Sequence, residues 1–320
     1  MGLKVVRFEQ KGVIRWGVVV ENQIKPIQAV YDSLSSLLTQ GHRELREAQF
    51  SSDKGFGLDE VHLLSPVTQP ARIVCQGVNY SSHRLEAGMQ PQRPDYNLIF
   101  TKSDTSLSGP NDDVIRPEHV HLLDYEIELG LIIGKPITSP TEITPTNFLE
   151  YVPGIVITND ISARDVQLVE GQWFKGKSYR TFCPAGPYLY LLDEDEVPLL
   201  HDLELKLTVN GEVRQQANTS QLLYKPEETL SELSQIVDFY PGDLVMTGTP
   251  GGVAVKLSSE DMQNMSNSSL SGQAKLQLLL KSQQGQLAYL NDGDEIVCEI
   301  KSSDGRVDLG IQRNRVISSR

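Results

Sequence analysis

The sequence has few cysteines and no long apolar run. Its three cysteines, Cys75, Cys183 and Cys298, are scattered and match no metal-binding or redox spacing. We therefore expect a reducing compartment, and the cytoplasm is the simplest assignment. No apolar stretch approaches the roughly 20 residues that a membrane-spanning helix needs, so we expect no membrane partner.

Positive charge is also in short supply. The chain carries 29 lysines and arginines against 42 aspartates and glutamates, a net charge of −13. This surplus disfavours nucleic acid and anionic membranes as partners, because both are polyanions. The length of 320 residues allows one large domain or two of unequal size.

Many short strand patterns with a few short helical ones predict an α+β fold in which β structure dominates. The segment 64–70 carries two prolines and is typical of a linker. We therefore predict a small N-terminal domain over residues 1–68 and a larger domain over residues 69–320.

Several local patterns in the larger domain carry specific predictions. The pair Asn210-Gly211 predicts a type I′ turn in a hairpin. Apolar spacing predicts a helix over 226–239 that buries, among others, Ile236. We also expect a loop over 258–272, which lacks apolar periodicity, and a strand over 275–280.

The stretch 123–133 alternates between apolar and acidic residues. Its odd positions are all apolar, and its even positions begin with Asp124, Glu126 and Glu128. A strand places these sets on opposite faces. Neighbouring carboxylates repel and lose hydration when buried, so water, a basic partner or a cation must offset them. A hard cation with oxygen ligands is the simplest answer, and a solvated sheet face is the alternative.

Asp160 ends a predicted buried strand, a position where functional side chains are often presented. Together with Glu126, Glu128 and water it would suit Mg²⁺ or Mn²⁺. No histidine or cysteine lies within these motifs, which argues against zinc. The alternative is that Asp160 only caps the following helix.

Three further positions could carry chemistry. His83 and Glu86 share one face of a predicted helix over 79–88, so the carboxylate could orient the imidazole as a base. Lys177 follows an aromatic stretch and could stabilise an oxyanion. The glycine-rich turn around Thr249 could present N–H groups and a hydroxyl to an anion. The alternatives are an exposed helix-face pair, a surface lysine and a plain tight turn.

Taken together, these motifs resemble the fumarylacetoacetate hydrolase family. The matching segments occur in the family's order: 77–86, 124–129, 159–167, 176–178 with 182–187, and 242–253. The resemblance implies a mixed β-sandwich roll, a small N-terminal domain as in the longer members, and a homodimer.

The resemblance also implies roles for individual residues. Family members bind Mg²⁺, Mn²⁺ or Ca²⁺ at the positions that match Glu126, Glu128 and Asp160. The resemblance further implies catalytic roles for His83, Glu86 and Lys177 and a substrate site lined by Gln167 and Thr249, while Arg164 and Asp165 are expected to brace their loop.

Two features depart from the family pattern. Arg180 stands where many relatives have an acidic residue, and it could contact a substrate carboxylate or be solvated. Residues 254–289 form a longer insertion than the usual link after the glycine-rich turn.

The resemblance favours a metal-dependent hydrolase that cleaves a C–C bond in a small acylpyruvate or β-diketo acid, such as a fumarylpyruvate- or fumarylacetoacetate-like substrate. An isomerase, decarboxylase or tautomerase of a 2-oxo or 2-hydroxydienedioic acid, for example oxaloacetate, would use the same motifs. A non-catalytic ligand-binding relative is a third reading, disfavoured by the full set of acid/base and metal-ligating residues.

Overall fold

The computed structural model describes residues 2–52, 54–286 and 288–319, and within them two sheets dominate. The large sheet has the order β4-β3-β2-β1-β15-β12-β11-β18-β6-β7, with β5 paired to β1. Its strands are β1 (Leu3–Gln10), β2 (Val13–Val20), β3 (Gln23–Pro26), β4 (Phe56–Gly57), β5 (His62–Leu64), β6 (Ile73–Gly77), β7 (Leu98–Lys102), β11 (Ile127–Ile132), β12 (Gly154–Asn159), β15 (Leu189–Leu191) and β18 (Leu244–Met246).

The second sheet has the order β17-β16-β19-β20-β9. Its strands are β9 (Val114–Arg116), β16 (Leu203–Val209), β17 (Glu212–Asn218), β19 (Glu295–Ser302) and β20 (Asp308–Ser318). Two short pairs complete the strands: β10 (Leu123–Asp124) with β13 (Ser162–Ala163), and β8 (Leu107–Ser108) with β14 (Cys183–Pro184).

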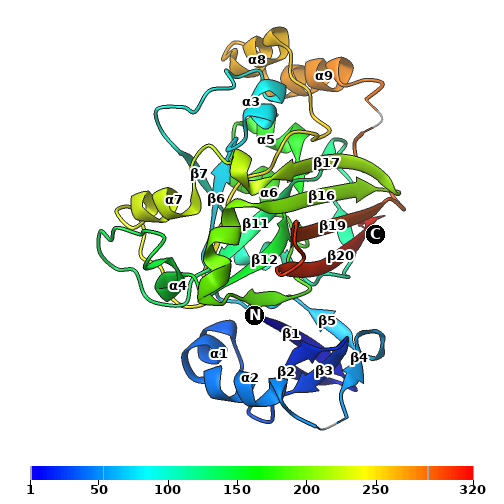
Figure 1. Ribbon diagram of the computed structural model, residues 1–320. Helices are drawn as coiled ribbons and strands as arrows, with labels where there is room; N and C mark the ends of the chain where they lie inside the picture. Colours follow the sequence, from blue (N-terminus) through cyan, green and yellow to red (C-terminus); the bar gives the residue numbers. More distant parts are fainter. Residues whose placement is uncertain (1, 53, 287, 320) are drawn as a thin grey trace.

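The helices are short and lie around these sheets (Figure 1). The α-helices are α1 (Leu34–Gln40), α2 (His42–Gln49), α3 (Ser81–Glu86), α4 (Phe148–Tyr151), α5 (Arg164–Glu170), α6 (Trp173–Lys177), α7 (Pro226–Leu233), α8 (Ser259–Ser266) and α9 (Gly272–Ser282). The 3₁₀ turns are η1 (Leu58–Glu60), η2 (Asp104–Ser106), η3 (Glu194–His201) and η4 (Thr219–Gln221). In the described parts of the chain, no helix has both the length and the apolar character to cross a membrane.

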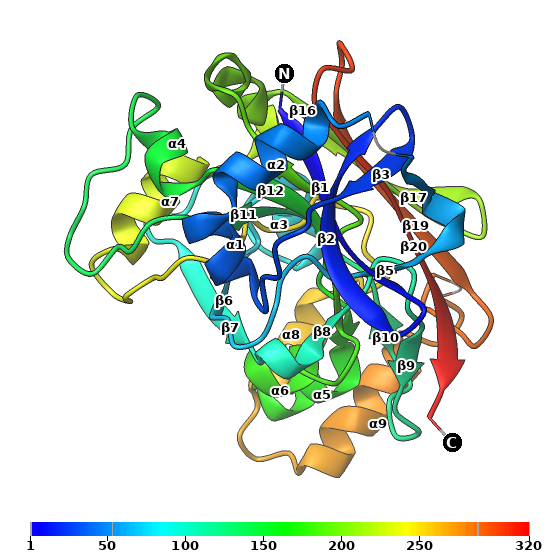
Figure 2. The same cartoon turned by 90° about the horizontal axis from the view of Figure 1, so that it is seen from below.

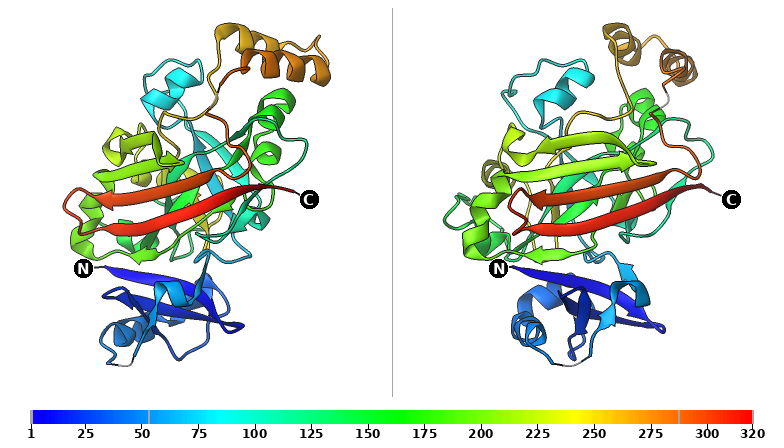
Figure 3. Two further views of the ribbon diagram at one scale, coloured as in Figure 1. Left: turned by 90° about the vertical axis from the view of Figure 1, so that its right-hand side faces the viewer. Right: turned by 45° about the vertical axis from the view of Figure 1, so that its right-hand side comes forward.

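The two sheets pack face to face, with β11 against β16 and β12 against β19 and β20 (Figure 3). Leu129 and Leu131 of β11 share one buried cluster with Leu205 and Leu207 of β16. Each such leucine stabilises the fold by about 1.5–3 kcal/mol through burial. The strand-rich α+β sandwich and the apolar odd face of 123–133 are therefore confirmed.

The opposite face of β11 changes character along its length. At the C-terminal end of β11, Ile132 packs in a cluster with Leu34 and Leu37 of α1. Figure 2 shows α1 and α2 on this side of the molecule. Near the N-terminal end of β11, the same face carries the Glu128 carboxylate. The N-terminal helices thus cover the apolar part of this face, and the acidic part is left for the site.

The N-terminal strands extend the large sheet, because β1 pairs antiparallel with β15. The N-terminal region nevertheless lies as a small unit at one end of the molecule (Figure 1). The domain boundary near residue 68 stays a prediction.

The strand predicted over 275–280 is wrong, because these residues lie in α9. Leu276, Leu278 and Leu280 alternate as in a strand, but leucine favours helices, and Ser271 caps this one by accepting a hydrogen bond from Ala274 N–H. The expected loop over 258–272 is wrong in part, because α8 forms within it behind its own Ser258 cap.

Two other local predictions have mixed outcomes. The helix predicted over 226–239 ends at Leu233, and Ile236 is 67 % exposed instead of buried. Beyond Leu233 the chain continues as a hydrogen-bonded turn, in which Val237 N–H donates to the Leu233 carbonyl at 2.9 Å, and the Ser234 hydroxyl bonds to the Thr141 backbone. The hairpin turn is confirmed, since Asn210 and Gly211 both have the positive φ that a type I′ turn requires.

Candidate active site

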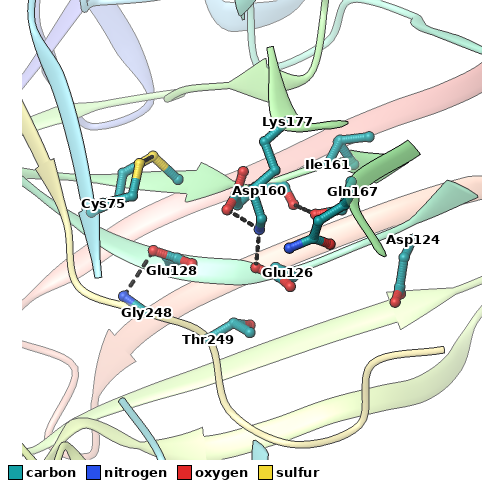
Figure 4. Close-up of polar contacts among 12 residues, drawn as sticks. Cys75, Asp124, Glu126, Glu128, Asp160, Ile161, Gln167, Lys177, Gly248 and Thr249 are labelled. Carbon is teal, nitrogen blue, oxygen red and sulfur yellow. Dashed lines mark hydrogen bonds and ion pairs between the residues drawn. The ribbon is translucent and has the colours of Figure 1, made fainter. Parts of the chain in front are cut away.

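The pairing of β11 with β12 brings the acidic residues together. Ile127 lies opposite Asn159, and Asp160 N–H donates to the Glu126 carbonyl at 2.7 Å. Carboxylate oxygens of Glu126, Glu128 and Asp160 all lie within 4.8 Å of one another, and all three residues are buried (Figure 4). Adjacent antiparallel strands therefore place residues from two distant motifs around one point.

Basic side chains neutralise two of these carboxylates. Lys177, at the end of α6, bonds to Glu126 at 2.9 Å and also to Asp160 (Figure 4). Arg164 Nη2 donates to Glu126 at 2.5 Å, and Lys102 Nζ donates to Asp160 at 2.5 Å. Glu126 and Asp160 are thus held by opposite charges in a buried environment.

These contacts also set the protonation of the paired groups. Burial alone would raise the pKa of Glu126, but Lys177 and Arg164 outweigh it and hold that pKa well below its ordinary value. Burial would lower the pKa of Lys177, but Asp160 and Glu126 raise it above its ordinary value. Glu126 is therefore a carboxylate and Lys177 an ammonium at neutral pH.

Glu128 differs from its neighbours because, in the described residues, no lysine, arginine or histidine forms an ion pair with it. It is 1 % exposed and accepts a hydrogen bond from Gly248 N–H at 2.8 Å. Burial, then the charges of Asp160 and Glu126, raise its pKa well above the ordinary value. The nearby Tyr80 hydroxyl is buried and has no hydrogen-bond partner among residues 2–52, 54–286 and 288–319. An all-oxygen donor set with one uncompensated charge fits a hard divalent cation, so the triad can hold one.

A cavity of about 20 Å³ opens beside the carboxylates. Its lining comprises Gln76, Gly77, Val78, His83, Phe100, Glu126, Arg164, Gln167, Trp173, Lys177 and Thr249. His83 Nδ1 and Gln76 Oε1 are buried there and form no hydrogen bond within the described part of the chain. The space suits about one water molecule, so a substrate can enter only if a wall moves.

His83 and Glu86 both lie on α3, but they are not tightly paired. His83 Nδ1 is 4.0 Å from Glu86 Oε2, which is too long for a hydrogen bond. The Glu86 carboxylate instead accepts from Gly252 N–H at 2.9 Å and from Lys256 Nζ at 2.6 Å. Burial raises the pKa of Glu86, but His83, Lys256 and the Gly252 N–H outweigh burial and lower it.

The three predicted substrate-binding residues have different surroundings. Gln167 lines the cavity and accepts from Arg164 Nη1 at 2.9 Å. The Thr249 hydroxyl donates to the Ile127 carbonyl at 2.9 Å and accepts from Gln215 at 2.8 Å, so it holds the glycine-rich turn. Arg180 is exposed and does not line the cavity, so a contact with substrate would require another conformation.

Comparison with known proteins places the chain in a family. The family described as fumarylacetoacetate (FAA) hydrolase C-terminal matches residues 72–317. The chain belongs to the fumarylacetoacetate hydrolase family of enzymes. It is 34 % identical over 307 residues to a mitochondrial oxaloacetate tautomerase of Homo sapiens, and this match covers 94 % of this chain and 84 % of that protein. The corresponding tautomerase of Rattus norvegicus is 33 % identical over 306 residues, with the same coverage.

Solved structures agree with this assignment. A fumarylacetoacetate hydrolase from Exiguobacterium antarcticum has a TM-score of 0.72 and 31 % identity, over 99 % of this chain and 100 % of that one. A maleylpyruvate hydrolase from Sphingobium sp. SYK-6, in complex with manganese (II) ion and pyruvate, has a TM-score of 0.71 and 26 % identity, with the same coverage. The predicted family and fold are confirmed. The homodimer and the cytoplasmic location stay predictions, and the named tautomerases are mitochondrial proteins.

The structure adds two residues to this family site that the sequence reasoning missed or undervalued. Lys102 had no predicted role, although a buried cluster of carboxylates requires basic partners and a lysine at the end of an apolar strand is a candidate for one. Arg164, expected to brace a loop, is the first residue of α5 and donates to Asp124 at 2.8 Å and to Glu126. Asp165 lies in the first turn of α5 and accepts from His121 N–H at 2.7 Å.

We expect Lys102→Met to destabilise the metal-free protein by about 3 kcal/mol. Breaking a buried ion pair typically costs about 3–5 kcal/mol, and Lys177 still partners Asp160, so the lower end applies. Urea unfolding with EDTA measures the change, and added Mg²⁺ should restore part of it. Lys175→Met is the matched control, because Lys175 forms an exposed pair with Glu170 and should change stability little. Equal effects of both substitutions would contradict a structural role for the Lys102 pair.

Proposed function

We propose that this protein is a divalent-metal-dependent tautomerase of a 2-oxo acid, with the keto–enol interconversion of oxaloacetate as the leading reaction. The observation that carries the proposal is the 33–34 % identity, over 94 % of the chain, to proteins named oxaloacetate tautomerases. The buried site supports it, because enolisation needs a stabilised oxyanion and one proton-transferring group.

In this proposal Glu126, Glu128 and Asp160 hold Mg²⁺ or Mn²⁺, and Ca²⁺ could also be accepted by the same oxygen donors. Among the described residues no basic side chain pairs with Glu128, whose bonded partner is Gly248 N–H, and this supports a cation at the triad. The ion would supply positive charge that polarises the 2-oxo group and stabilises an enolate.

The remaining residues transfer the proton and position the substrate. In the keto-to-enol direction the C3–H bond breaks, its electron pair forms the C2–C3 double bond, and the 2-oxo oxygen gains a proton, so nothing is consumed. His83 is the proton acceptor in this proposal, because its Nδ1 forms no hydrogen bond with any residue that the structure describes and the residue lines the cavity. The charged Lys177 stabilises the developing oxyanion, and Gln167 contacts a substrate carboxylate.

A second candidate function is hydrolysis of the C–C bond of an acylpyruvate. Similarity to the maleylpyruvate hydrolase over 99 % of the chain favours it. In this reaction His83, assisted by Glu86, would activate water. The Glu86 carboxylate and the His83 imidazole would have to approach closer than the 4.0 Å that separates Glu86 Oε2 from His83 Nδ1.

A substrate panel with Mg²⁺ tests the proposal. We expect the protein to accelerate loss of the ultraviolet absorbance of enol-oxaloacetate above the buffer rate, with little C–C cleavage of acylpyruvates or maleylpyruvate by product analysis. Parallel assays with EDTA and with Glu128→Gln control for buffer catalysis and for contaminating enzymes. Cleavage of acylpyruvates without tautomerisation of oxaloacetate would replace the leading function with the second one.

A further inference from the structure

Residues 248–257, which we call the crossbar, connect the acidic site to α3. The backbone N–H groups of the crossbar donate to buried or half-buried carboxylates along its length: Gly248 to Glu128 at 2.8 Å, Gly252 to Glu86 at 2.9 Å, and Ala254 to Asp124 at 2.8 Å. Gly251 N–H also donates to the Ser82 hydroxyl on α3 at 3.0 Å. Movement of α3 therefore breaks contacts with the crossbar.

Lys256 adds the charged contact at the end of the crossbar. Its Nζ lies 2.6 Å from Glu86 Oε1, and the Glu86 side chain is only 18 % exposed. The next residue, Leu257, donates its N–H to the Glu86 carbonyl at 3.3 Å. Side chain and backbone together thus attach the last turn of α3 to the crossbar.

The end of the inserted helix α9 holds the backbone of Lys256 from the other side. Gln283, the residue that follows α9, donates its side-chain amide to the Lys256 carbonyl at 3.0 Å. Figures 1 and 3 show α8 and α9 beside α3, at the end of the molecule opposite the N-terminal region. Lys256 lies in the insertion over 254–289, outside the motifs that match the family.

The position of α3 decides access to the cavity. Its His83 forms part of the cavity wall, and a cavity of about 20 Å³ admits no 2-oxo acid. Entry of a substrate therefore requires movement of a wall element, a gating step common in enzymes. The contacts with the crossbar resist this movement for α3 and also set where the Glu86 carboxylate lies relative to His83.

We propose that Lys256 is a positioning residue that fixes the Glu86 carboxylate and, through α3, keeps His83 over the cavity. The inference rests on the proposed function in one respect, that His83 transfers the proton. Since Lys256 is 51 % exposed, its effect on global stability should be small, and its effect should appear in the opening of α3 and in turnover.

The test compares Lys256→Met, which keeps the aliphatic stem, with Lys256→Arg, which restores the charge. Hydrogen exchange of the amides over 80–88 should be about fivefold to tenfold faster in Lys256→Met, the range expected when one partly exposed charged hydrogen bond is lost, and near wild type in Lys256→Arg. The kcat for oxaloacetate should fall by a similar factor, while Mg²⁺-dependent oxalate binding stays unchanged.

The pH dependence of kcat/KM distinguishes a positioning role from a purely structural one, because a purely structural role for Lys256 would leave it unchanged. The charged and titratable groups around Glu86 are His83, Lys256 and Tyr125. Because Lys256 helps to lower the pKa of Glu86, the acid limb of kcat/KM should move to higher pH in Lys256→Met and return in Lys256→Arg. Lys281→Met, an exposed position on α9, is the matched control and should resemble wild type.

Unchanged exchange and unchanged kcat in Lys256→Met would overturn the inference, as would an equal loss in Lys281→Met. The exchange measurement needs no substrate. If wild type fails to act on oxaloacetate, the proposed function falls, and the exchange result still decides whether Lys256 holds α3.

Discussion

Replacing Glu128 with glutamine should abolish Mg²⁺ binding and lower turnover by about 10³-fold or more, while raising the stability of the metal-free protein. The loss follows because a bound ion supplies several kcal/mol of charge stabilisation in the transition state. The gain follows because Glu128 is buried, pairs with no basic side chain that the structure describes and has a raised pKa, whereas glutamine carries no charge to desolvate.

The gain in stability should depend on pH with a definite sign. In the unfolded chain the Glu128 carboxyl titrates near 4.5, and in the metal-free fold it titrates well above that value. Between these values the folded state binds more protons than the unfolded state, so stability falls as pH rises. With EDTA, the Tm difference between Glu128→Gln and wild type should therefore be small near pH 4.5 and grow toward neutral pH.

Calorimetry with Mg²⁺ and thermal unfolding with EDTA measure both effects. Glu299→Gln is a suitable control, because Glu299 lies in β19 and is not one of the three carboxylates of the acidic triad. Mg²⁺ affinity that is unchanged in Glu128→Gln would remove this residue from the metal site. Asp160→Ala is a less direct test, because it also removes the ion-pair partner of the buried Lys102 and one of the two carboxylates that pair with Lys177.

His83→Ala should lower the tautomerisation rate by about 10²–10⁴-fold, the usual contribution of a general acid or base. The variant should keep its affinity for Mg²⁺ and for oxalate, because His83 lies outside the carboxylate triad. Metal-dependent decarboxylation of oxaloacetate should fall much less, since the ion alone can accept the electron pair released with CO₂. Stopped-flow absorbance and product analysis separate the two reactions.

His62→Ala, at a half-exposed position of the N-terminal region, is the matched control. A tautomerisation rate within a few-fold of wild type in His83→Ala would show that this histidine is structural and that another group carries the proton. If wild type hydrolyses acylpyruvates and His83→Ala loses that activity, the C–C hydrolase function takes precedence.

The sequence by itself determined the residues of the acidic site and the family. The alternation over 123–133 depends only on the two-residue period of a strand, so it correctly predicted one apolar and one acidic face. The order of motifs from 77–86 to 242–253 predicted a site that draws on distant segments. By contrast, the local pattern over 275–280 suited a strand as well as a helix, and the Ser271 cap and the burial of Leu279 decided for the helix.

Only the tertiary structure decided which charges meet. Lys102 is 58 residues from Asp160 in the chain, and Lys256 is 170 residues from Glu86. The Thr249 hydroxyl is used to hold a turn, a role that its motif does not reveal. Such pairings depend on how the strands and the inserted helices pack, because a charge finds its partner through three-dimensional proximity and burial. The sequence therefore specified the carboxylates that could bind a metal. Packing specified their basic partners and the residues that hold α3 over the cavity.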